Sequence, residues 1–165
     1  MKILVFGGSG FLGSYLIDEI ISRGYSVVNA DLNPPKYNID KQKYLSVDIL
    51  NKEQVFKTIN SSFDCVYNLA GMSDLNESVH NPKKTYELNI IGHIHILEAC
   101  ISNKIKHYIY SSSAYVYSLQ GSHYGISKLA SEKIIEEYNK LFGLNYTILR
   151  YGSLYGERAN TKNGI

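Results

Sequence analysis

Three glycines at a spacing of three residues, Gly7, Gly10 and Gly13, limit the folds that this chain can adopt. They directly follow residues 2–6 (KILVF), an apolar run typical of a β-strand, and lead into residues 11–22 (FLGSYLIDEIIS), which carry apolar side chains at helical spacing. A strand, a glycine-rich turn and a helix in this order indicate that the helix packs closely on the strand. The chain therefore begins like a parallel α/β fold.

The same alternation continues along the rest of the chain. Apolar runs typical of strands are followed by longer segments with apolar positions every three or four residues. We expect further strands at 25–31, 44–48, 64–71, 107–113 and 145–153, and helices at 51–60, 83–102 and 124–142. We expect the inward faces of the last two helices to carry Ile90, Ile94, Leu97 and Ile101, and Ile134, Tyr138, Leu141 and Phe142. The pattern predicts one domain, a doubly wound, mostly parallel sheet of the Rossmann type.

The composition of the 165 residues fits one compact domain: 44% are hydrophobic, and 17 basic residues nearly balance 15 acidic ones. A net charge of +2 without charge runs provides no surface for nucleic acid or an anionic membrane. Cys65 and Cys100 are too few for a disulfide scaffold and lack the spacing of a metal site, so we expect buried thiols in a cytoplasmic protein without a metal. The first apolar run is too short for a signal peptide or a membrane span.

The glycine turn predicts a dinucleotide site. A helix that begins after such a turn offers backbone N–H groups and the positive end of its dipole to a pyrophosphate. Asp31 ends the second expected strand, where a carboxylate accepts hydrogen bonds from both ribose hydroxyls and repels a 2′-phosphate, which favours NAD over NADP. An ordinary turn with a surface aspartate is the alternative. The residues that we expect to contact the cofactor here are Gly7, Gly10, Phe11, Leu12, Gly13 and Asp31.

A second group of residues has the character of a reaction centre. Tyr124 and Lys128 are four residues apart, so they share one face of the expected helix 124–142. The ammonium group is expected to lower the pKa of the phenol from its usual value of about 10, which suits proton transfer to and from a hydroxyl. Ser113 ends a strand at the edge where ligands bind in this fold. Because the chain has 15 tyrosines, a chance match is the alternative.

In this order, the motifs resemble those of the extended short-chain dehydrogenases/reductases, and specifically the NAD-dependent epimerase/dehydratase group that acts on nucleotide sugars. The resemblance spans nearly the whole chain. The segments that carry it are GGSGFLG (7–13), Asp31, VDIL (47–50), NLAG (68–71), ELNIIGHIHILEA (87–99), YSSSAYVY (110–117), YGISK (124–128) and LRYGSLYG (149–156).

The resemblance implies roles for these residues. Such enzymes pass a hydride from a sugar carbon to NAD while a tyrosine takes the hydroxyl proton, which makes Tyr124 the general base. Lys128 would tune Tyr124 and bind the nicotinamide ribose, and Ser113 would hold the reacting hydroxyl. The resemblance further implies that Asp48 and Ile49 flank the adenine, that Leu69, Ala70 and Gly71 line the cofactor cleft, and that Asn89 makes a structural contact.

The chain departs from the family pattern in several places. Ala114 and Tyr115 stand where dehydratases usually carry an Asp-Glu pair, which favours epimerisation or simple redox chemistry over dehydration. Only residues 118–123 (SLQGSH) connect the strand end to Tyr124, so a substrate loop is expected to be short. We interpret residues 151–165 as the beginning of a C-terminal substrate region, of which the sequence lacks the remainder.

Other interpretations stay open. A catalytically silent NAD-binding module and an NADP-type sugar ketoreductase share most of these motifs. The resemblance also implies a homodimer through the helices near 83–102 and 124–142. His123 adjoins Tyr124 and is a candidate for substrate contact, although packing is the simpler explanation for this histidine and for His93 and His95.

Overall fold

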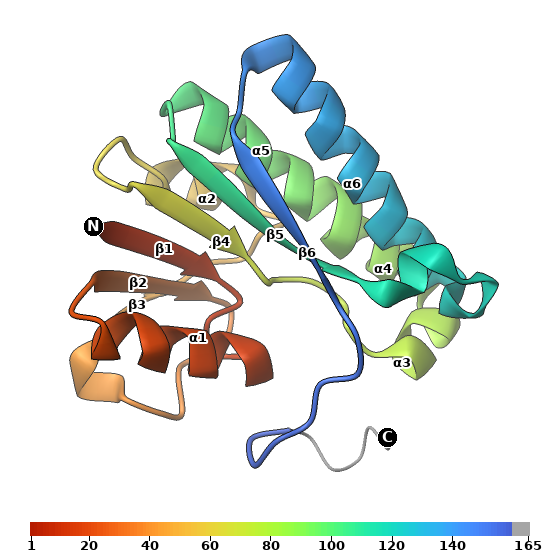
Figure 1. Ribbon diagram of the computed structural model, residues 1–165, viewed down its shortest axis with the longest axis horizontal. Coiled ribbons are helices and arrows are strands. Elements are labelled where there is room, and N and C mark those ends of the chain that lie inside the picture. Colours follow the sequence, from red (N-terminus) through yellow and green to blue (C-terminus); the bar gives the residue numbers. More distant parts are fainter. Residues whose placement is uncertain (160–165) are drawn as a thin grey trace.

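A computed structural model of the chain describes residues 1–159. Six parallel strands form one sheet in the order β3-β2-β1-β4-β5-β6 (Figure 1). The predicted doubly wound parallel sheet is confirmed, and every strand boundary lies within three residues of its predicted position. The strands are β1 (Lys2–Phe6), β2 (Ser26–Asp31), β3 (Lys43–Ser46), β4 (Cys65–Asn68), β5 (His107–Ser113) and β6 (Tyr146–Tyr151).

Helices cover the sheet from both sides (Figure 1). One side carries α1, and the other carries α2, α5 and α6. The α-helices are α1 (Phe11–Ser22), α2 (Lys52–Thr58), α3 (Leu75–His80), α4 (Pro82–Tyr86), α5 (His93–Ser102) and α6 (Ser122–Phe142). Short 3₁₀ turns are η1 (Ile39–Lys41), η3 (Ala114–Tyr117) and η4 (Leu119–Gly121), and η2 (Glu87–Gly92) is a π-helix. No helix within residues 1–159 is long and apolar enough to cross a membrane.

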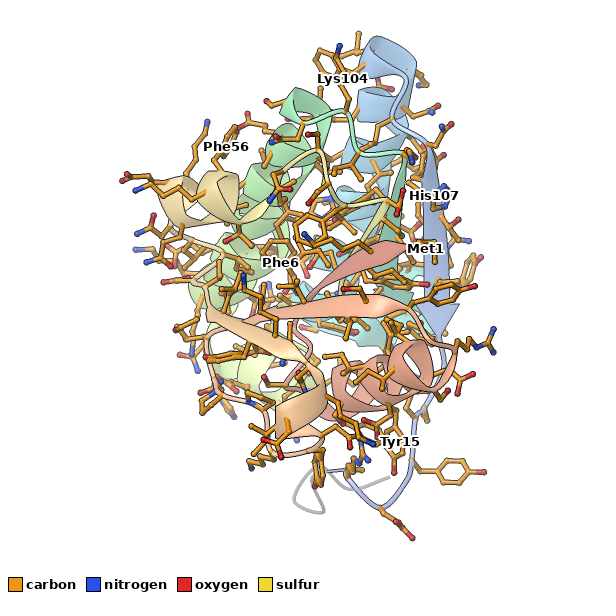
Figure 2. All side chains as sticks on the ribbon, turned by 90° about the vertical axis from the view of Figure 1, so that its left-hand side faces the viewer. Met1, Phe6, Tyr15, Phe56, Lys104 and His107 are labelled. Atoms are coloured by element: carbon orange, nitrogen blue, oxygen red, sulfur yellow. The ribbon has the colours of Figure 1, made fainter. Side chains whose placement is uncertain are left out.

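The central strand β1 is buried on both faces. Leu4 and Phe6 belong to the core on the α5 side, and Ile3 and Val5 to the core below α1. Figure 2 shows Phe6 pointing into the interior. Because successive strand residues face opposite sides, a shift of one residue would exchange the two sets. The position of β1, and of the glycine turn that follows it, is therefore fixed from both sides.

The glycine turn brings backbone onto backbone. A Cβ atom on Gly13 would lie 2.1 Å from the carbonyl oxygen of Gly7, and one on Gly7 would lie 2.6 Å from the amide nitrogen of Ala70. Gly7 also has a φ of +79°, in the region that favours glycine. The turn thus joins β1, the start of α1 and the end of β4 without any side chain between them.

Helix α3 was not predicted. Its six residues contain few apolar side chains, and Val79 is half exposed, so they lack the periodic apolar face of a packed helix. The helix is fixed at its start instead, where the Asp74 side chain accepts a hydrogen bond from the Glu77 amide at 2.8 Å.

The long helix expected at 83–102 is divided by the π-helical turn η2. The predicted apolar stripe consequently does not stay on one buried face: Leu97 is fully buried, but Ile90 and Ile94 are only partly so. Ile96 takes a fully buried place beside Leu97 instead. A π turn holds an extra residue, so the buried face of α5 is rotated relative to that of α4.

The end of α6 also differs from its prediction. Leu141 and Phe142 were expected to face inward but are 70% and 58% exposed. Gly143 ends the helix in a left-handed conformation with a φ of +70°, and this reversal turns Leu144 into the core instead.

The segment after β6 returns to α1. The Arg158 guanidinium lies 4.3 Å from the ring centroid of Tyr15 and 4.1 Å from that of Tyr37. Its Nη2 atom donates a hydrogen bond of 2.6 Å to Asp18 Oδ2. Figure 2 shows Tyr15 beside this segment. Cation–π contacts and an ion pair therefore hold residues 152–159 against the first helix. The remainder of the range 151–165, predicted to begin a substrate region, lies outside the described residues.

Candidate functional site

The predicted site residues gather along one edge of the sheet. Gly7 follows β1, Asp31 ends β2, Asp48 follows β3, Leu69 follows β4 and Ser113 ends β5. All strands are parallel, so their carboxyl ends meet at the same edge (Figure 1). The strand order changes direction between β1 and β4, which in open α/β sheets is where ligands bind.

The start of α1 has the features that a pyrophosphate requires. Gly10 caps the helix without a side-chain hydrogen bond, and the first turn contains no acidic residue. The backbone N–H groups at the start of a helix have no partner within the helix, and the helix dipole attracts an anion there. Phe11 and Leu12 are the first two residues of α1, and the Phe11 ring packs edge-on against Tyr15 at 5.8 Å. Gly10 is exposed and carries no side chain, so the start of α1 is open to the pyrophosphate of a dinucleotide.

Asp31 does more than the sequence predicted. Its Oδ2 atom accepts a hydrogen bond of 3.0 Å from the Ser9 amide, and Oδ1 accepts one of 2.9 Å from the Asn33 amide. The carboxylate thus fastens the glycine turn to β2. It is partly exposed, and a carboxylate has about four acceptor positions, so capacity remains for the hydroxyls of a ribose.

The residues after β3 are held by η2 and α5. The Ile49 side chain packs on Gly92, where an added Cβ atom would lie 2.8 Å from Ile49. The Ile49 carbonyl oxygen lies 2.9 Å from His95 Nδ1. Asp48 is partly exposed, and its Oδ1 atom accepts a hydrogen bond from the Leu50 amide. Asp48 and Ile49 therefore form a fixed wall at the β3 end of the edge.

The residues after β4 lie between the glycine turn and the helices. Gly7 lies against the backbone of both Leu69 and Ala70, because a Cβ atom on Gly7 would be 2.9 Å from the Leu69 carbonyl oxygen and 2.6 Å from the Ala70 amide nitrogen. Gly71 has a φ of +146° and lies against Asn89, whose Oδ1 atom would be 2.4 Å from a Cβ atom on Gly71. These three residues of the predicted cofactor cleft therefore share one surface with the glycines.

Asn89 makes the structural contact that the resemblance implied. Its side chain is buried in η2, where Oδ1 accepts from the Met72 amide at 2.7 Å and Nδ2 donates to the Met72 carbonyl at 3.1 Å. Nδ2 also donates to Ser127 Oγ at 2.8 Å. The loop after β4 is therefore tied to α6, next to the predicted reaction centre.

Ser113, Tyr124 and Lys128 come together where β5 meets α6. All three are buried, with 5%, 9% and 5% of their surface exposed. The Lys128 Nζ atom donates a hydrogen bond of 2.8 Å to the Ser111 carbonyl and lies 5.8 Å from the centre of the Tyr124 ring. Ser113 Oγ accepts a hydrogen bond from the Tyr115 amide at 3.3 Å. The structure thus places a hydroxyl, a phenol and an ammonium group in one buried cluster.

The acidity of these groups follows from their burial. Burial lowers the pKa of Lys128 to about 8, although the carboxylate of Glu132 opposes this effect. Burial also raises the pKa of Tyr124, although a hydrogen bond with Ser113 opposes it. The predicted lowering of the Tyr124 pKa by Lys128 is therefore wrong for this chain. The phenol is more deeply buried than its sequence position could reveal.

The histidines are held by packing and hydrogen bonds. His123 Nδ1 lies 2.8 Å from the Tyr86 hydroxyl, so the histidine is engaged by α4. His93 Nδ1 lies 3.0 Å from the Tyr108 hydroxyl, and burial lowers the pKa of His93 to about 3, which keeps it neutral. The simpler explanation for His93 and His95 is confirmed.

Sequence reasoning missed two charged residues beside the reaction centre. Glu132 lies four residues after Lys128 on α6 and is fully buried, and Arg150 on β6 binds it through two hydrogen bonds of 2.9 and 2.7 Å. The four-residue spacing was a visible signal of proximity to Lys128. The partner on β6 had no such signal, because its distance depends on the pairing of β5 with β6.

Replacing Lys128 by methionine should stabilise the fold. The buried ammonium costs folding free energy while it is charged in both states, that is, below pH 8. Lys128→Met should raise the free energy of unfolding at pH 7 by up to about 3 kcal/mol. This gain should shrink between pH 8 and 10.5, because the wild-type lysine then loses its proton only when folded.

Urea unfolding at a series of pH values measures this difference. Lys133→Met, on the same helix but in an exposed ion pair with Glu136, is the matched control and should change stability by less than about 0.5 kcal/mol. A Lys128→Met protein that is less stable than the wild type at pH 7 would contradict the assignment of a costly buried charge.

Comparison with known proteins shows the family of the chain. The sequence model of the NAD dependent epimerase/dehydratase family matches residues 3–164. A curated relative, the UDP-glucose 4-epimerase of Lactobacillus helveticus, is 31% identical over 99% of this chain and 55% of its own length. The chain thus spans little more than half the length of this relative.

Solved structures show the same likeness. The UDP-glucose 4-epimerase of Thermotoga maritima, in a crystal structure with UDP-glucose, superposes with a TM-score of 0.87 at 30% identity, over 97% of this chain and 58% of that one. The enzyme of the same name from Thermus thermophilus, in complex with NAD, gives a TM-score of 0.88 at 28% identity and the same coverage. By its sequence and its fold, the chain belongs to the NAD-dependent epimerase/dehydratase family.

Proposed function

We propose that this chain is the NAD-binding part of an enzyme that epimerises a nucleotide sugar by hydride transfer through a ketone. One observation carries the proposal: the buried cluster of Ser113, Tyr124 and Lys128 lies on the same sheet edge as the glycine turn and Asp31. A phosphate-binding turn alone would fit many nucleotide proteins. A proton-transferring cluster on the same edge is what a hydride-transfer reaction adds to it.

Each residue of the cluster has a distinct task. Ser113 Oγ accepts and donates hydrogen bonds and would hold the reacting sugar hydroxyl. Tyr124 would take the proton of that hydroxyl as the sugar C–H bond breaks and the C=O bond forms. When bound, NAD would serve as the acceptor of the hydride from the sugar carbon. In the reverse step the same hydride would return to the other face of the ketone carbon while Tyr124 gives its proton back to the sugar oxygen, and the product is the epimer.

Lys128 supplies positive charge at this point. With a pKa of about 8 it is largely protonated at neutral pH, and it would place a positive charge near the phenolate that forms during the reaction, against the effect of burial on Tyr124. The three donors of an ammonium group allow Lys128 to bind the hydroxyls of the nicotinamide ribose in addition to the Ser111 carbonyl.

Epimerisation is favoured over dehydration by the residues after Ser113. Ala114 carries no functional group, and the ring of Tyr115 packs edge-on against Tyr124 with centroids 6.2 Å apart. A dehydratase needs an acid and a base beside the sugar to eliminate water, and η3 (Ala114–Tyr117) has no carboxylate.

The names of the relatives support a UDP-sugar as substrate. The Lactobacillus helveticus and Thermotoga maritima proteins are UDP-glucose 4-epimerases, and the latter was crystallised with UDP-glucose. Because the chain spans 55–58% of these proteins, its own activity and its sugar are part of the proposal. The same shortness supports a second candidate, an NAD-binding module without catalytic activity.

The cofactor assignment predicts a preference for NAD that depends on Asp31. We expect the chain to bind NAD more tightly than NADP, because the carboxylate accepts ribose hydroxyls and repels a 2′-phosphate. Asp31→Asn should weaken NAD binding about tenfold, since a charge-assisted hydrogen bond is worth about 1.5–3 kcal/mol. It should also reduce the difference in affinity between NAD and NADP, because the amide does not repel a 2′-phosphate. Titration calorimetry with both dinucleotides measures this, with the exposed Asp40→Asn as the matched control. Absence of NAD binding would overturn the assignment, and tighter binding of NADP would favour a ketoreductase.

The role of Tyr124 predicts a loss of turnover without a loss of binding. Tyr124→Phe removes only the phenolic hydroxyl, so conversion of UDP-glucose to UDP-galactose should slow by at least about 100-fold. NAD affinity should stay within about twofold of the wild type. Tyr155→Phe, at a side chain that is 82% exposed, is the control. Unchanged turnover in Tyr124→Phe would exclude this role, and a wild-type chain that binds NAD without turnover would support the silent module.

We further propose that the chain forms a homodimer through η2 and α6. Ile91, Ile126 and Leu129 are 46%, 57% and 41% exposed there, so two elements that contact each other both offer aliphatic side chains to a partner. Ile126→Glu should halve the mass measured by analytical ultracentrifugation. Leu141→Glu, near the other end of α6 and 70% exposed, should leave it unchanged. A monomeric wild type would refute this interface.

A further inference from the structure

Glu132 is a carboxylate without any exposed surface. It lies one turn beyond Lys128 on α6 and makes three hydrogen bonds. Its Oε1 atom accepts from Arg150 Nε at 2.9 Å and from Ser112 Oγ at 2.5 Å, and Oε2 accepts from Arg150 Nη2 at 2.7 Å. A buried ion pair is rarely more stabilising than apolar side chains of the same size. Its place beside the reaction centre therefore calls for an explanation other than stability.

The ion pair joins three elements that surround the site. Arg150 on β6 is paired in register with Ser112 on β5, and Ser112 directly precedes Ser113. The Arg150 guanidinium also binds the hydroxyl of Tyr117 on η3 and lies 4.6 Å from the centre of that ring. One carboxylate and one guanidinium thus connect α6, the end of β5 and η3. A displacement of Glu132 would be transmitted to Ser113 through its neighbour.

The same carboxylate is the counter-charge of Lys128. Lys128 is almost completely buried, and its Nζ atom is hydrogen-bonded to an uncharged carbonyl. Burial opposes the charge of Glu132 too, but the hydrogen bonds from Arg150 and Ser112 outweigh it and lower the pKa of Glu132. Glu132 therefore stays ionised. Its negative charge raises the pKa of Lys128 against the larger effect of burial.

The groups that surround Lys128 leave Glu132 as the source of this charge. The Tyr110 ring, 4.9 Å from Nζ, and Tyr124 are neutral phenols whose pKa values burial raises. His93 is neutral, since burial and the charge of Lys128 both lower its pKa. Arg150 is a cation and would disfavour a second positive charge, but its guanidinium is paired with the Glu132 carboxylate.

We propose that Glu132, held by Arg150, is a positioning residue of the site: it fixes the end of β5 through Ser112 and balances the positive charge of Lys128. The catalytic meaning of this inference rests on the proposed function, because only a hydride-transfer site needs a charged Lys128 beside Tyr124. The electrostatic coupling of Glu132 to Lys128 is a property of the fold and is measurable without any turnover.

The first test is a titration of Lys128 in the whole chain. Lysine labelled with ¹³C at the ε position reports its own protonation by NMR, and Lys128→Met identifies the signal. Glu132→Gln keeps the shape and most hydrogen bonds but removes the charge, so the pKa of Lys128 should fall by about one unit. Glu137→Gln is the matched control, because it removes an exposed carboxylate from the same helix. An unchanged Lys128 pKa in Glu132→Gln would overturn the proposal.

The double variant Glu132→Gln/Arg150→Gln protects this test against a folding failure of the single one, because it leaves neither member of the buried pair charged without a partner. The Glu132 carboxylate is the charge that raises the pKa of Lys128, so this pKa should again be lower than in the wild type. A folded double variant with an unchanged Lys128 pKa would equally overturn the proposal.

The second test connects the pair to the cofactor. If Lys128 binds the nicotinamide ribose through its ammonium group, NADH affinity should fall as the pH rises through the Lys128 pKa. In Glu132→Gln the midpoint of this fall should move down by the same amount as the pKa. A shifted pKa with an unshifted NADH profile would exclude the positioning role. Absence of NADH binding by the wild type would refute the proposed function, while the lysine titration would still decide the coupling.

Discussion

The contact of backbone with backbone at the glycine turn is the constraint on which the rest of the structure depends. Gly13 lies over Gly7, and Gly7 lies against Ala70, at distances that leave no room for a Cβ atom. This contact sets the direction of α1 and joins the ends of two neighbouring strands. Asp31 adds the end of a third strand through its hydrogen bond to the Ser9 amide. The phosphate end of the site is thus built almost entirely from main chain.

The reaction end of the site is built in the opposite way, from buried polar side chains. Lys128, Glu132 and Arg150 meet where α6, β5 and β6 join, and the Arg150 guanidinium keeps the buried Glu132 carboxylate ionised there. Main-chain contacts tolerate little variation in shape, whereas the Glu132–Arg150 pair is sensitive to the loss of either partner. The two halves of one sheet edge therefore depend on different physical interactions.

Much of the fold and of the candidate site could be predicted because the signals are local. The glycine spacing, Asp31 after a strand, and the four-residue step from Tyr124 to Lys128 are all visible within short segments. The predictions that were wrong concern depth of burial. The exposure of Leu141 and Phe142 depends on how Gly143 reverses the chain, and the pKa of Tyr124 depends on desolvation that periodicity does not report. The partner of Glu132 lies on another strand, so only the strand pairing reveals it.

The π-helical turn η2 allows one continuous helical segment, from α4 to α5, to pack against two different parts of the molecule. Before the turn, α4 contacts α3 and α6, and within the turn Asn89 holds the loop after β4. After the turn, α5 buries Ile96 and Leu97 in the core. A regular α-helix turns by about 100° per residue, so without the extra residue it could form only one of these two sets of contacts. The extra residue of η2 rotates α5 so that both sets of contacts form. Deleting one residue there would turn α5 relative to Asn89, so that either the loop after β4 or the buried face of Ile96 and Leu97 would lose its contacts.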